Sequence, residues 1–238
     1  MKSSITIVLP TLNETELPAK IETLAWYLQA HPYEIIVVDD SSDEAFERLS
    51  VELKNKGHVR LIKGERKRKG HAVKKGILES KGSIVFYIDA DLRIPLENIP
   101  VFIHLIEQEN FDLVMAQRPF DQTPRPWLRS CCSMALLCLA RGVVFQSSFF
   151  QDTQCGFKAI KGDAARAMAK RQMIDGGMVD IEYLYMARRN QLKIDRVSIV
   201  PLAEIRPSRI NLWRCIFSDV FDLFRIRIQG MRGQYQIQ

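Results

Sequence analysis

Three segments of the chain are β-prone runs rich in Val and Ile, and each ends at polar or acidic residues. The runs cover residues 4–9, 34–38 and 84–88, and the last one leads directly into Asp89 and Asp91. Continuous apolar runs of this kind are typical of parallel strands that are buried on both faces of a sheet. Ligands of open α/β sheets bind outside the carboxyl ends of such strands. The pattern therefore predicts an α/β fold with a binding site at that edge.

The residues that follow the first two runs predict turns and helix starts. Residues 10–14 are a turn-forming stretch, after which Leu24 and Leu28 continue a helical pattern. The second run ends in the Asp-Asp-Ser-Ser stretch at residues 39–42, whose side chains can cap the helix that follows. The first two strands thus also end in polar loops.

The two carboxylates after the third run suit a hard divalent cation, which prefers oxygen ligands and often shares them with substrate phosphates. An Asp-x-Asp pair alone is common by chance, so its interpretation depends on the rest of the chain. With that support, we expect Mg²⁺ or Mn²⁺ at Asp89 and Asp91.

Five ordered motifs resemble those of the family-2 glycosyltransferases. Three are Pro-Thr-Leu-Asn-Glu at residues 10–14, Val-Asp-Asp-Ser-Ser at 38–42 and Asp-Ala-Asp at 89–91. The fourth begins at Lys69 and ends at Gly76, with Arg68 where the family usually has a first glycine. The fifth is a set of segments that resembles the polyprenyl-phosphate branch, especially dolichyl-phosphate glucosyltransferases: residues 152–158, 164–166, 179–184 and 206–209. The resemblance covers almost the whole chain, roughly residues 5 to 228.

This resemblance implies a fold and an activity. The fold is a single nucleotide-diphospho-sugar transferase domain, with a Rossmann-like, mixed but mainly parallel sheet flanked by helices. We expect the catalytic domain at residues 1–210 and an amphipathic helix and tail at 211–238. The implied activity is inverting, single-displacement transfer of a hexose, glucose from UDP-glucose, to a polyprenyl phosphate.

By the same resemblance, the donor nucleotide meets residues from several strand ends. The residues implied for the nucleobase and ribose pocket are Pro10, Leu12, Glu14 and Asp39, with Lys69 close to the nucleotide. The diphosphate is expected at Asp89, Ala90 and Asp91, with Arg206 and Arg209 closing over it. Leu12 replaces an aromatic residue that is frequent in the family, which leaves the base preference open.

The acceptor determines the mechanism. A phosphate monoester carries about −1.5 to −2 charge at pH 7, so it is already a nucleophile and needs no general base. By resemblance, Arg118 and Arg129 hold this phosphate, because a planar guanidinium can meet two phosphate oxygens at once. Asp152 stands where related enzymes with hydroxyl acceptors carry a base. Here we expect it to orient other groups or contact the sugar, with a structural turn as the alternative.

Arg93 is a departure from the mannosyl-transferring relatives, which often have Gln after Asp-x-Asp-Leu. A guanidinium has five donors and no acceptor, so it cannot ligate a cation. We expect Arg93 to reach the diphosphate instead and the cation to be held weakly.

Length and composition fit one large domain, since 238 residues of 47% hydrophobic composition can bury a substantial core. The chain enters a strand almost at once, so we expect no secretory signal peptide. Five cysteines without metal-ligand spacing favour a reducing compartment. The net charge of +6 is clustered at residues 63–75 and 206–232, which suits nucleotide phosphates or anionic lipid headgroups. No base-reading motif supports a nucleic-acid partner.

A polyprenyl acceptor requires contact with a membrane surface. Residues 130–151 are too polar for a confident span, and residues 213–228 show apolar positions at helical spacing opposite polar ones. This amphipathic helix either packs on the sheet or lies on the bilayer surface. We expect a protein peripheral to the cytosolic face of a membrane, without a transmembrane span.

Several alternatives remain open from the sequence. The chain could be a soluble transferase with a hydroxyl acceptor and Asp152 as base, a transferase using GDP-mannose, or a non-catalytic sugar-nucleotide-binding partner. The sequence leaves the oligomeric state open.

Overall fold

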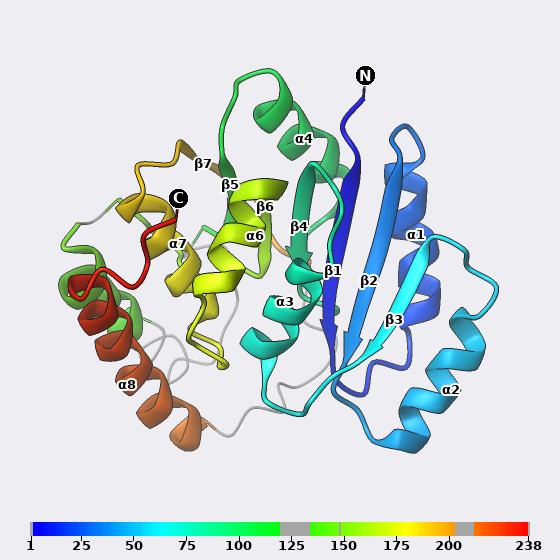
Figure 1. Cartoon of the computed structure of the whole chain (residues 1–238), viewed down its shortest axis with the longest axis horizontal. Helices are drawn as coiled ribbons and strands as arrows, with labels where there is room; N and C mark the ends of the chain where they lie inside the picture. Colours follow the sequence, from blue (N-terminus) through cyan, green and yellow to red (C-terminus); the bar gives the residue numbers. More distant parts are fainter. Residues whose placement is uncertain (1, 120–133, 148, 203–211, 238) are drawn as a thin grey trace.

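A seven-stranded sheet forms the centre of the protein (Figure 1). The computed structural model describes all residues except 1, 120–133, 148, 203–211 and 238, and for residues 212–216 it describes the backbone. The strand order is β3-β2-β1-β4-β6-β5-β7. In chain order the strands are β1 Ile5–Thr11, β2 Tyr33–Asp39, β3 Val59–Lys63, β4 Ile84–Ile88, β5 Leu113–Gln117, β6 Phe157–Lys161 and β7 Ile194–Ser198.

Strand β6 runs antiparallel to its neighbours β4 and β5, and the other strand pairs are parallel. The predicted mixed, mainly parallel sheet is therefore confirmed. Its flanking elements are α1 Leu17–Leu28, α2 Asp43–Leu53, α3 Lys69–Leu78, η1 Leu96–Asn98, α4 Ile99–Glu107, the π-helical turn η2 Ala140–Phe145, α6 Gly162–Arg171, α7 Val179–Arg189 and α8 Leu212–Met231.

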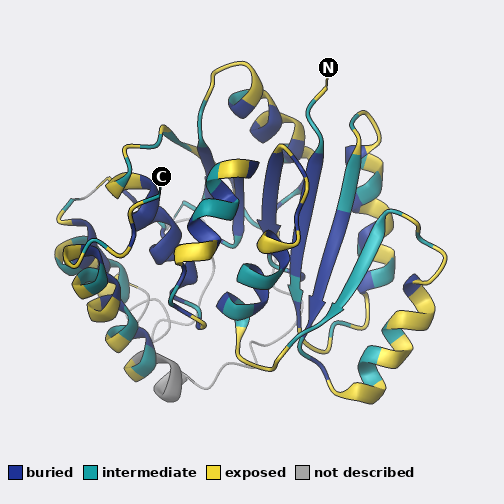
Figure 2. Ribbon diagram, viewed as in Figure 1, coloured by how far each residue is buried: buried dark blue, intermediate teal, exposed yellow. Residues whose placement is uncertain are grey.

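The central strands are buried on both faces, as their continuous apolar runs predict (Figure 2). Alternate residues of β4 enter different clusters: Phe86 packs with the residues of α1 and α4, and Val85 and Tyr87 pack with those of α3, α6 and α7. Because side chains alternate across a strand, a run without polar gaps is what two apolar layers require. The predicted strand type follows directly from this double burial.

Strand β1 extends two residues beyond its predicted end. Pro10 pairs with Val38 and Thr11 with Asp39, so both residues belong to the strand rather than to the predicted turn. The partner on the other side, β4, pairs with β1 only as far as Val8. Pro10 therefore lies where β1 has one neighbouring strand, and its missing N–H leaves no ladder bond unmade. The second strand ends one residue later than predicted, at Asp39, and the predicted cap is confirmed because Ser42 accepts a bond from the Ala45 N–H at 3.3 Å at the start of α2.

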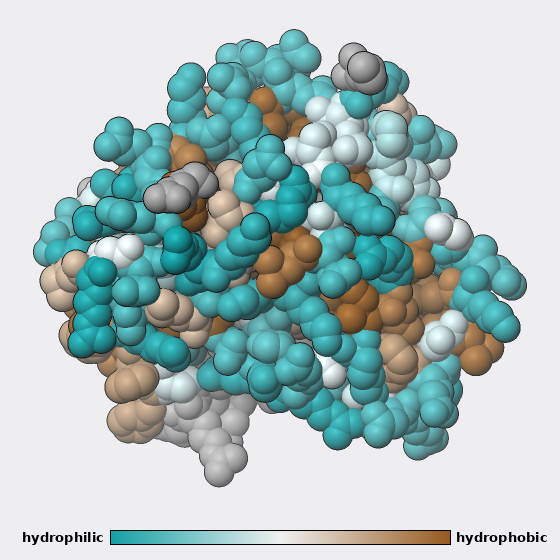
Figure 3. All heavy atoms as spheres, viewed as in Figure 1, coloured by the Kyte–Doolittle hydropathy of each residue, from teal (hydrophilic) through white to brown (hydrophobic). Residues whose placement is uncertain are grey.

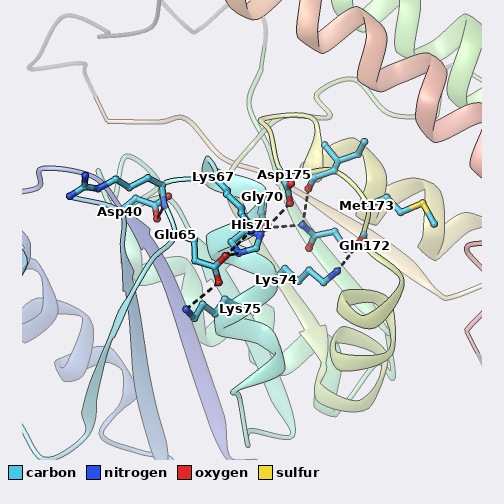
Figure 4. Close-up of polar contacts among 12 residues, drawn as sticks. Asp40, Glu65, Lys67, Gly70, His71, Lys74, Lys75, Gln172, Met173 and Asp175 are labelled. Carbon is cyan, nitrogen blue, oxygen red and sulfur yellow. Dashed lines mark hydrogen bonds and ion pairs between the residues drawn. The ribbon is translucent and has the colours of Figure 1, made fainter. Parts of the chain in front are cut away.

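The first turn of α3 is held tightly against the segment before α7. A Cβ atom at Gly70 would lie 2.4 Å from the Ile174 carbonyl oxygen, so a side chain there has no room. The Gln172 amide donates to the Gly70 carbonyl at 2.7 Å. Figure 4 shows His71 between Glu65 and Asp175, with each carboxylate 3.3 Å from one ring nitrogen. These contacts fix the position of Lys69, the first residue of α3.

The backbone conformation at Arg68 favours glycine, which is the usual residue at this position in the motif that the chain resembles. Its backbone has φ 85° and ψ 171°, a region that is essentially restricted to glycine. Its guanidinium reaches α8, where Nη1 donates to the Ser218 hydroxyl at 3.2 Å and Nη2 lies 3.9 Å from an Asp219 carboxylate oxygen. The strained backbone of Arg68 is thus accompanied by contacts that glycine could not make.

Helix α8 packs against α7 and η2 through a face that includes Leu223 and Ile226. The tail after it is also anchored, since Tyr235 is buried and its hydroxyl donates to Glu182 at 2.7 Å. The predicted boundary between residues 210 and 211 lies outside the described residues. In the part of the chain that the structure describes, no helix is long and apolar enough to cross a membrane.

The apolar stripe predicted for α8 is exposed, where the structure describes its side chains. Phe217 is 77% exposed and Phe221 70%, and Phe224 and Ile228 are also exposed. For these four residues, the alternative that the stripe packs on the sheet is therefore wrong. The buried face of the helix is instead the one with Leu223 and Ile226, which lies against α7 and η2.

The strain at Arg68 can be measured by comparing two substitutions. Arg68→Gly and Arg68→Ala both lose the contacts with α8, but only alanine keeps a Cβ in the glycine region of the backbone. We expect the alanine variant to be less stable than the glycine variant by about 1 to 2 kcal/mol in urea unfolding. Equal stabilities would show that the loop relaxes and that the backbone stores no strain.

Candidate functional site

The carboxyl ends of β2, β1 and β4 lie next to one another at one edge of the sheet. This brings Asp39, the loop that contains Leu12 and Glu14, and the Asp89–Asp91 turn to the same edge. Beside the turn is a cavity lined by Ile88, Asp89, Asp91, Arg93, Ile94, Arg118, Cys155, Gly156 and Pro201. This cavity thus contains four residues, two acidic and two basic, that sequence analysis assigned to the diphosphate or the acceptor.

The Asp-x-Asp turn has an unusual backbone. The Asp89 N–H donates to the Gly156 carbonyl at 2.8 Å, and the Leu92 N–H donates to the Asp89 carbonyl at 3.0 Å. Leu92 has φ 50°, which is rare for a bulky residue, and its side chain is buried. The Arg93 N–H then points back to an Asp91 carboxylate oxygen at 3.4 Å. This tight turn is what allows Asp91 and Arg93 to line the same cavity.

The residues in this turn fit a divalent cation. Burial and, secondly, the nearby charge of Asp89 raise the pKa of Asp91, so positive charge placed beside this carboxylate would stabilise its ionised form. Among the described residues, no group of three or more His, Cys, Asp or Glu side chains could hold a metal ion. Asp91 and Asp89 would therefore hold Mg²⁺ or Mn²⁺ together with phosphate and water oxygens, which is how Mg²⁺ usually binds.

Asp89 is enclosed by two residues from distant parts of the chain. The Lys69 ammonium lies 2.8 Å from its Oδ1. On the other side, a Cβ atom at Gly156 would lie 2.0 Å from its Oδ2. Glycine at position 156 is therefore required for Asp89 to keep this orientation. Sequence analysis quoted Gly156 within a motif but gave it no role.

Beneath Asp89 lies a buried network of charges. Asp180 of α7 is 1% exposed and accepts bonds from Lys69 at 2.8 Å, from the Tyr87 hydroxyl at 3.1 Å and from Lys158 of β6. Burial opposes ionisation of Asp180, but Lys158 and Lys69 outweigh it and lower its pKa. Lys158 is fully buried and also donates to the Cys155 carbonyl at 2.6 Å.

Sequence reasoning missed this network, although a signal was present. Lys158 lies in a strand between Phe157 and Ala159, and Asp180 lies in the first turn of a helix that is otherwise mostly apolar. Charged residues in such surroundings are seldom fully buried unless they are paired. Only the fold shows which charges form the pairs.

Arg118 and Asp152 form a bidentate ion pair at the other side of the cavity. Arg118 Nε donates to Asp152 Oδ2 at 2.6 Å and Nη2 to Oδ1 at 3.0 Å, and the Arg118 backbone N–H adds a bond of 3.2 Å. Burial raises the pKa of Asp152, but the bonds and charge of Arg118 outweigh this effect, so the pKa is lowered. The pair fixes the guanidinium plane of Arg118 at the cavity wall.

The residues implied for the nucleotide follow the carboxyl ends of β1 and β2. Asp39 is 1% exposed and accepts bonds from the hydroxyls of Thr11 at 2.9 Å and Ser41 at 2.6 Å. Its Oδ2 is buried and has no hydrogen-bond partner among the described residues. This oxygen is therefore available to accept a bond from an N–H group of a ligand. Leu12 is exposed beside it.

Lys20 connects the β1 loop to the Asp-x-Asp turn. Its ammonium lies 3.5 Å from the Glu14 carboxylate and donates to the Ala90 carbonyl at 3.2 Å. Sequence analysis missed Lys20 because a lysine on an amphipathic helix is usually a solvated residue. The Lys20 ammonium thus joins Glu14 and Ala90, which sequence analysis assigned to different parts of the donor site.

Three predicted residues, Arg129, Arg206 and Arg209, lie outside the described residues. Cys155 was given no role; burial raises the pKa of its thiol to about 12, so it is no nucleophile at neutral pH.

The packing of Gly156 against Asp89 gives a direct test of the site. In Gly156→Ala the new methyl group would displace the Asp89 carboxylate, and we expect UDP binding in the presence of Mn²⁺ to weaken at least about tenfold in calorimetry, with the fold retained. Gly57→Ala is the matched control, because a Cβ there has nothing within 4 Å. Unchanged affinity in Gly156→Ala would separate Asp89 from the binding site.

Comparison with known proteins places these features in one family. The chain is 27% identical over 254 residues to the dolichyl-phosphate beta-glucosyltransferase of Dictyostelium discoideum, a match that covers 98% of this chain and 77% of that protein. It is 39% identical over 116 residues to an undecaprenyl-phosphate 4-deoxy-4-formamido-L-arabinose transferase of Yersinia pestis (strain Pestoides F), covering 46% of this chain and 35% of that protein.

Among solved structures, glucosyl-3-phosphoglycerate synthase from Mycobacterium tuberculosis, in complex with Mn²⁺, uridine diphosphate and glucosyl-3-phosphoglycerate, has the same fold. The TM-score is 0.67 at 19% identity, covering 99% of this chain and 81% of that chain. The model of the family "Glycosyl transferase family 2" matches residues 6–141, more than half of the sequence. The chain therefore belongs to glycosyl transferase family 2.

Proposed function

We propose that this protein transfers glucose from UDP-glucose to a polyprenyl phosphate, in a single inverting displacement at the cytosolic face of a membrane. The relatives named for dolichyl-phosphate and undecaprenyl-phosphate transfer support the acceptor class. The Dictyostelium relative, which matches over nearly the whole chain, supports glucose as the sugar.

The observation that carries the proposal is the bidentate pair of Arg118 and Asp152. A carboxylate whose pKa is lowered by a bound guanidinium is a weak base, so it is poorly suited to take a proton from a sugar hydroxyl. A phosphate monoester needs no such base, because it is already charged. It needs a fixed cation instead, and Arg118 is held at the cavity wall in the orientation that Asp152 sets.

On the donor side, the chain's own residues bind the nucleotide and stabilise the leaving group. Asp39 offers a buried acceptor to an N–H of the base, and Arg93 and Lys69 bring positive charge toward the diphosphate. A divalent cation on Asp91 and Asp89 would supply Lewis-acid stabilisation of the departing diphosphate. The displacement then joins an acceptor phosphate oxygen to the anomeric carbon as the bond from that carbon to the diphosphate breaks.

Two rivals are separated from this proposal by simple assays. A hydroxyl acceptor would make Asp152 a general base, and the rate would fall as that carboxylate is protonated at low pH. A non-catalytic partner would bind the sugar nucleotide without transferring the sugar. Radiolabelled UDP-glucose and GDP-mannose, each with and without a short-chain polyprenyl phosphate, distinguish these cases.

The assignment of Arg118 predicts a separation of binding from transfer. Arg118→Ala removes the cation for the acceptor, so we expect transfer to fall at least about a hundredfold, in line with loss of a charged hydrogen bond in a cavity. UDP affinity in calorimetry should change by less than about threefold. Arg48→Ala, on the exposed face of α2, is the control. Parallel loss of UDP affinity and transfer would move Arg118 to the donor site.

We also propose that the exposed face of α8 contacts the membrane surface. Phe217, Phe221, Phe224 and Ile228 form one apolar stripe on this helix, and Arg225 and Arg232 lie exposed near it. Figure 3 shows pale-brown, apolar residues at the lower left, where α8 lies in Figure 1. Aromatic side chains on an amphipathic helix with basic residues suit an anionic bilayer surface.

Vesicle sedimentation tests this contact. Replacing Phe217 and Phe224 with Ser should reduce binding to anionic vesicles about tenfold or more, because two exposed aromatic rings no longer enter the interface. Folding should be unaffected, since both rings are exposed. Trp26→Ser is the matched control, as Trp26 is 62% exposed on α1, across the molecule from α8 (Figure 1). Equal sedimentation of all three proteins would contradict the proposal.

A further inference from the structure

We propose that Lys69 is a built-in counter-cation of the donor site. It cancels the charge of Asp89, so that the cavity binds a divalent cation well only together with the donor diphosphate, and Asp180 is the positioning residue that keeps Lys69 there. The inference rests on the proposed function in one respect: it takes a nucleotide diphosphate and a divalent cation as the ligands.

The first argument is the geometry of Lys69. Its ammonium lies 2.8 Å from Asp89 Oδ1 and 2.8 Å from Asp180 Oδ2, so it bridges a cavity residue and a core residue. An Asp89 oxygen that is held by an ammonium is less available to a metal ion. Sequence analysis placed Lys69 near the nucleotide, whereas the structure gives it a specific partner in the Asp-x-Asp turn.

The second argument is the charge of the cavity. Among the described residues, the charged side chains that line it are Asp89, Asp91, Arg93 and Arg118. Two of them have a partner of opposite charge outside the lining, Lys69 for Asp89 and Asp152 for Arg118. These six groups comprise three cations and three anions, so the cavity has no net formal charge. A divalent cation gains little from such a site until a diphosphate adds negative charge.

The third argument is that Lys69 cannot easily leave. Asp180 is buried and anchored by Lys158 and Tyr87 as well as by Lys69, and unpairing a buried carboxylate is costly. The packing of Gly70 against residues 174–175 and the clamp around His71 hold the backbone of α3 in place (Figure 4). A lysine fixed in this way is a permanent part of the site's charge.

The same network makes the test practical. If Lys69 is replaced by methionine, Asp180 still has Lys158 and the Tyr87 hydroxyl, so the core keeps its charge balance and the protein should fold. Asp89, however, loses its partner, and the cavity gains a net negative charge. Lys75→Met is the matched control, with the same charge change on the same helix. The Lys75 ammonium donates to the Lys63 carbonyl at 3.0 Å and lies 3.7 Å from Glu65 (Figure 4), and Lys75 is not among the residues that line the cavity.

The experiment measures two affinities whose changes have opposite signs. Binding of Mn²⁺ alone, followed by electron paramagnetic resonance, should be at least about tenfold tighter in Lys69→Met than in wild type. Binding of UDP without metal, followed by calorimetry in EDTA, should be at least about tenfold weaker. Lys75→Met should stay within about threefold of wild type in both measurements.

Each other result overturns a defined statement. If both affinities of Lys69→Met fall, Lys69 only supports the fold of the site. If neither affinity changes, the charge of Lys69 does not influence the ligands. Either result overturns the inference. Lys69→Gln repeats the test if the methionine variant has a lowered melting temperature. If wild type binds UDP neither with nor without Mn²⁺, the proposed function itself fails, which is a separate outcome.

Discussion

The buried carboxylate of Asp180 is the constraint on which the site depends. A charge with 1% exposure must be paired, and here the partners come from three different elements: Lys158 of β6, Lys69 of α3 and Tyr87 of β4. Meeting this requirement draws α3, α7 and the middle of the sheet to one point. Asp89 lies directly above that point and is joined to it by Lys69.

The network also explains why several small residues are fixed around it. The first turn of α3 must approach the segment before α7 closely enough for Lys69 to reach Asp180, and only glycine at position 70 allows this approach. Gly156, one residue after Cys155, leaves space for the Asp89 carboxylate on the opposite side. Arg68, directly before α3, has a strained backbone conformation, and its side chain donates a hydrogen bond to Ser218 of α8. The close approach at Gly70 and the space at Gly156 thus accompany the placement of charges in and above the core.

The sequence predicted the parts of the fold that depend on local pattern. The runs at residues 34–38 and 84–88 became strands β2 and β4, and Asp89 follows β4 as expected. The sequence could not predict the pairs that join distant residues, because Lys69 and Asp180 are separated by 111 positions and no local pattern shows which charge pairs with which. The same limit applies to Gly156, whose role is visible only once Asp89 lies against it.

Helix α8 shows a second limit of pattern. The spacing of Phe217, Phe221 and Phe224 predicts an amphipathic helix, but a helix with apolar residues on two sides has two ways to dock. The side that turns inward carries Leu223 and Ile226, whose burial beside α7 and η2 removes apolar surface from water. Burial raises the pKa of Asp219 to about 6, so the nearby charge of Arg68 does not fully offset the loss of water around this carboxylate. The aromatic stripe is therefore left outside because the opposite face packs in the core, while Ser218 and Asp219 contact Arg68, the residue before the lysine that pairs with Asp89. The contacts with α8 and with Asp89 are thus made by two adjacent residues at the start of α3.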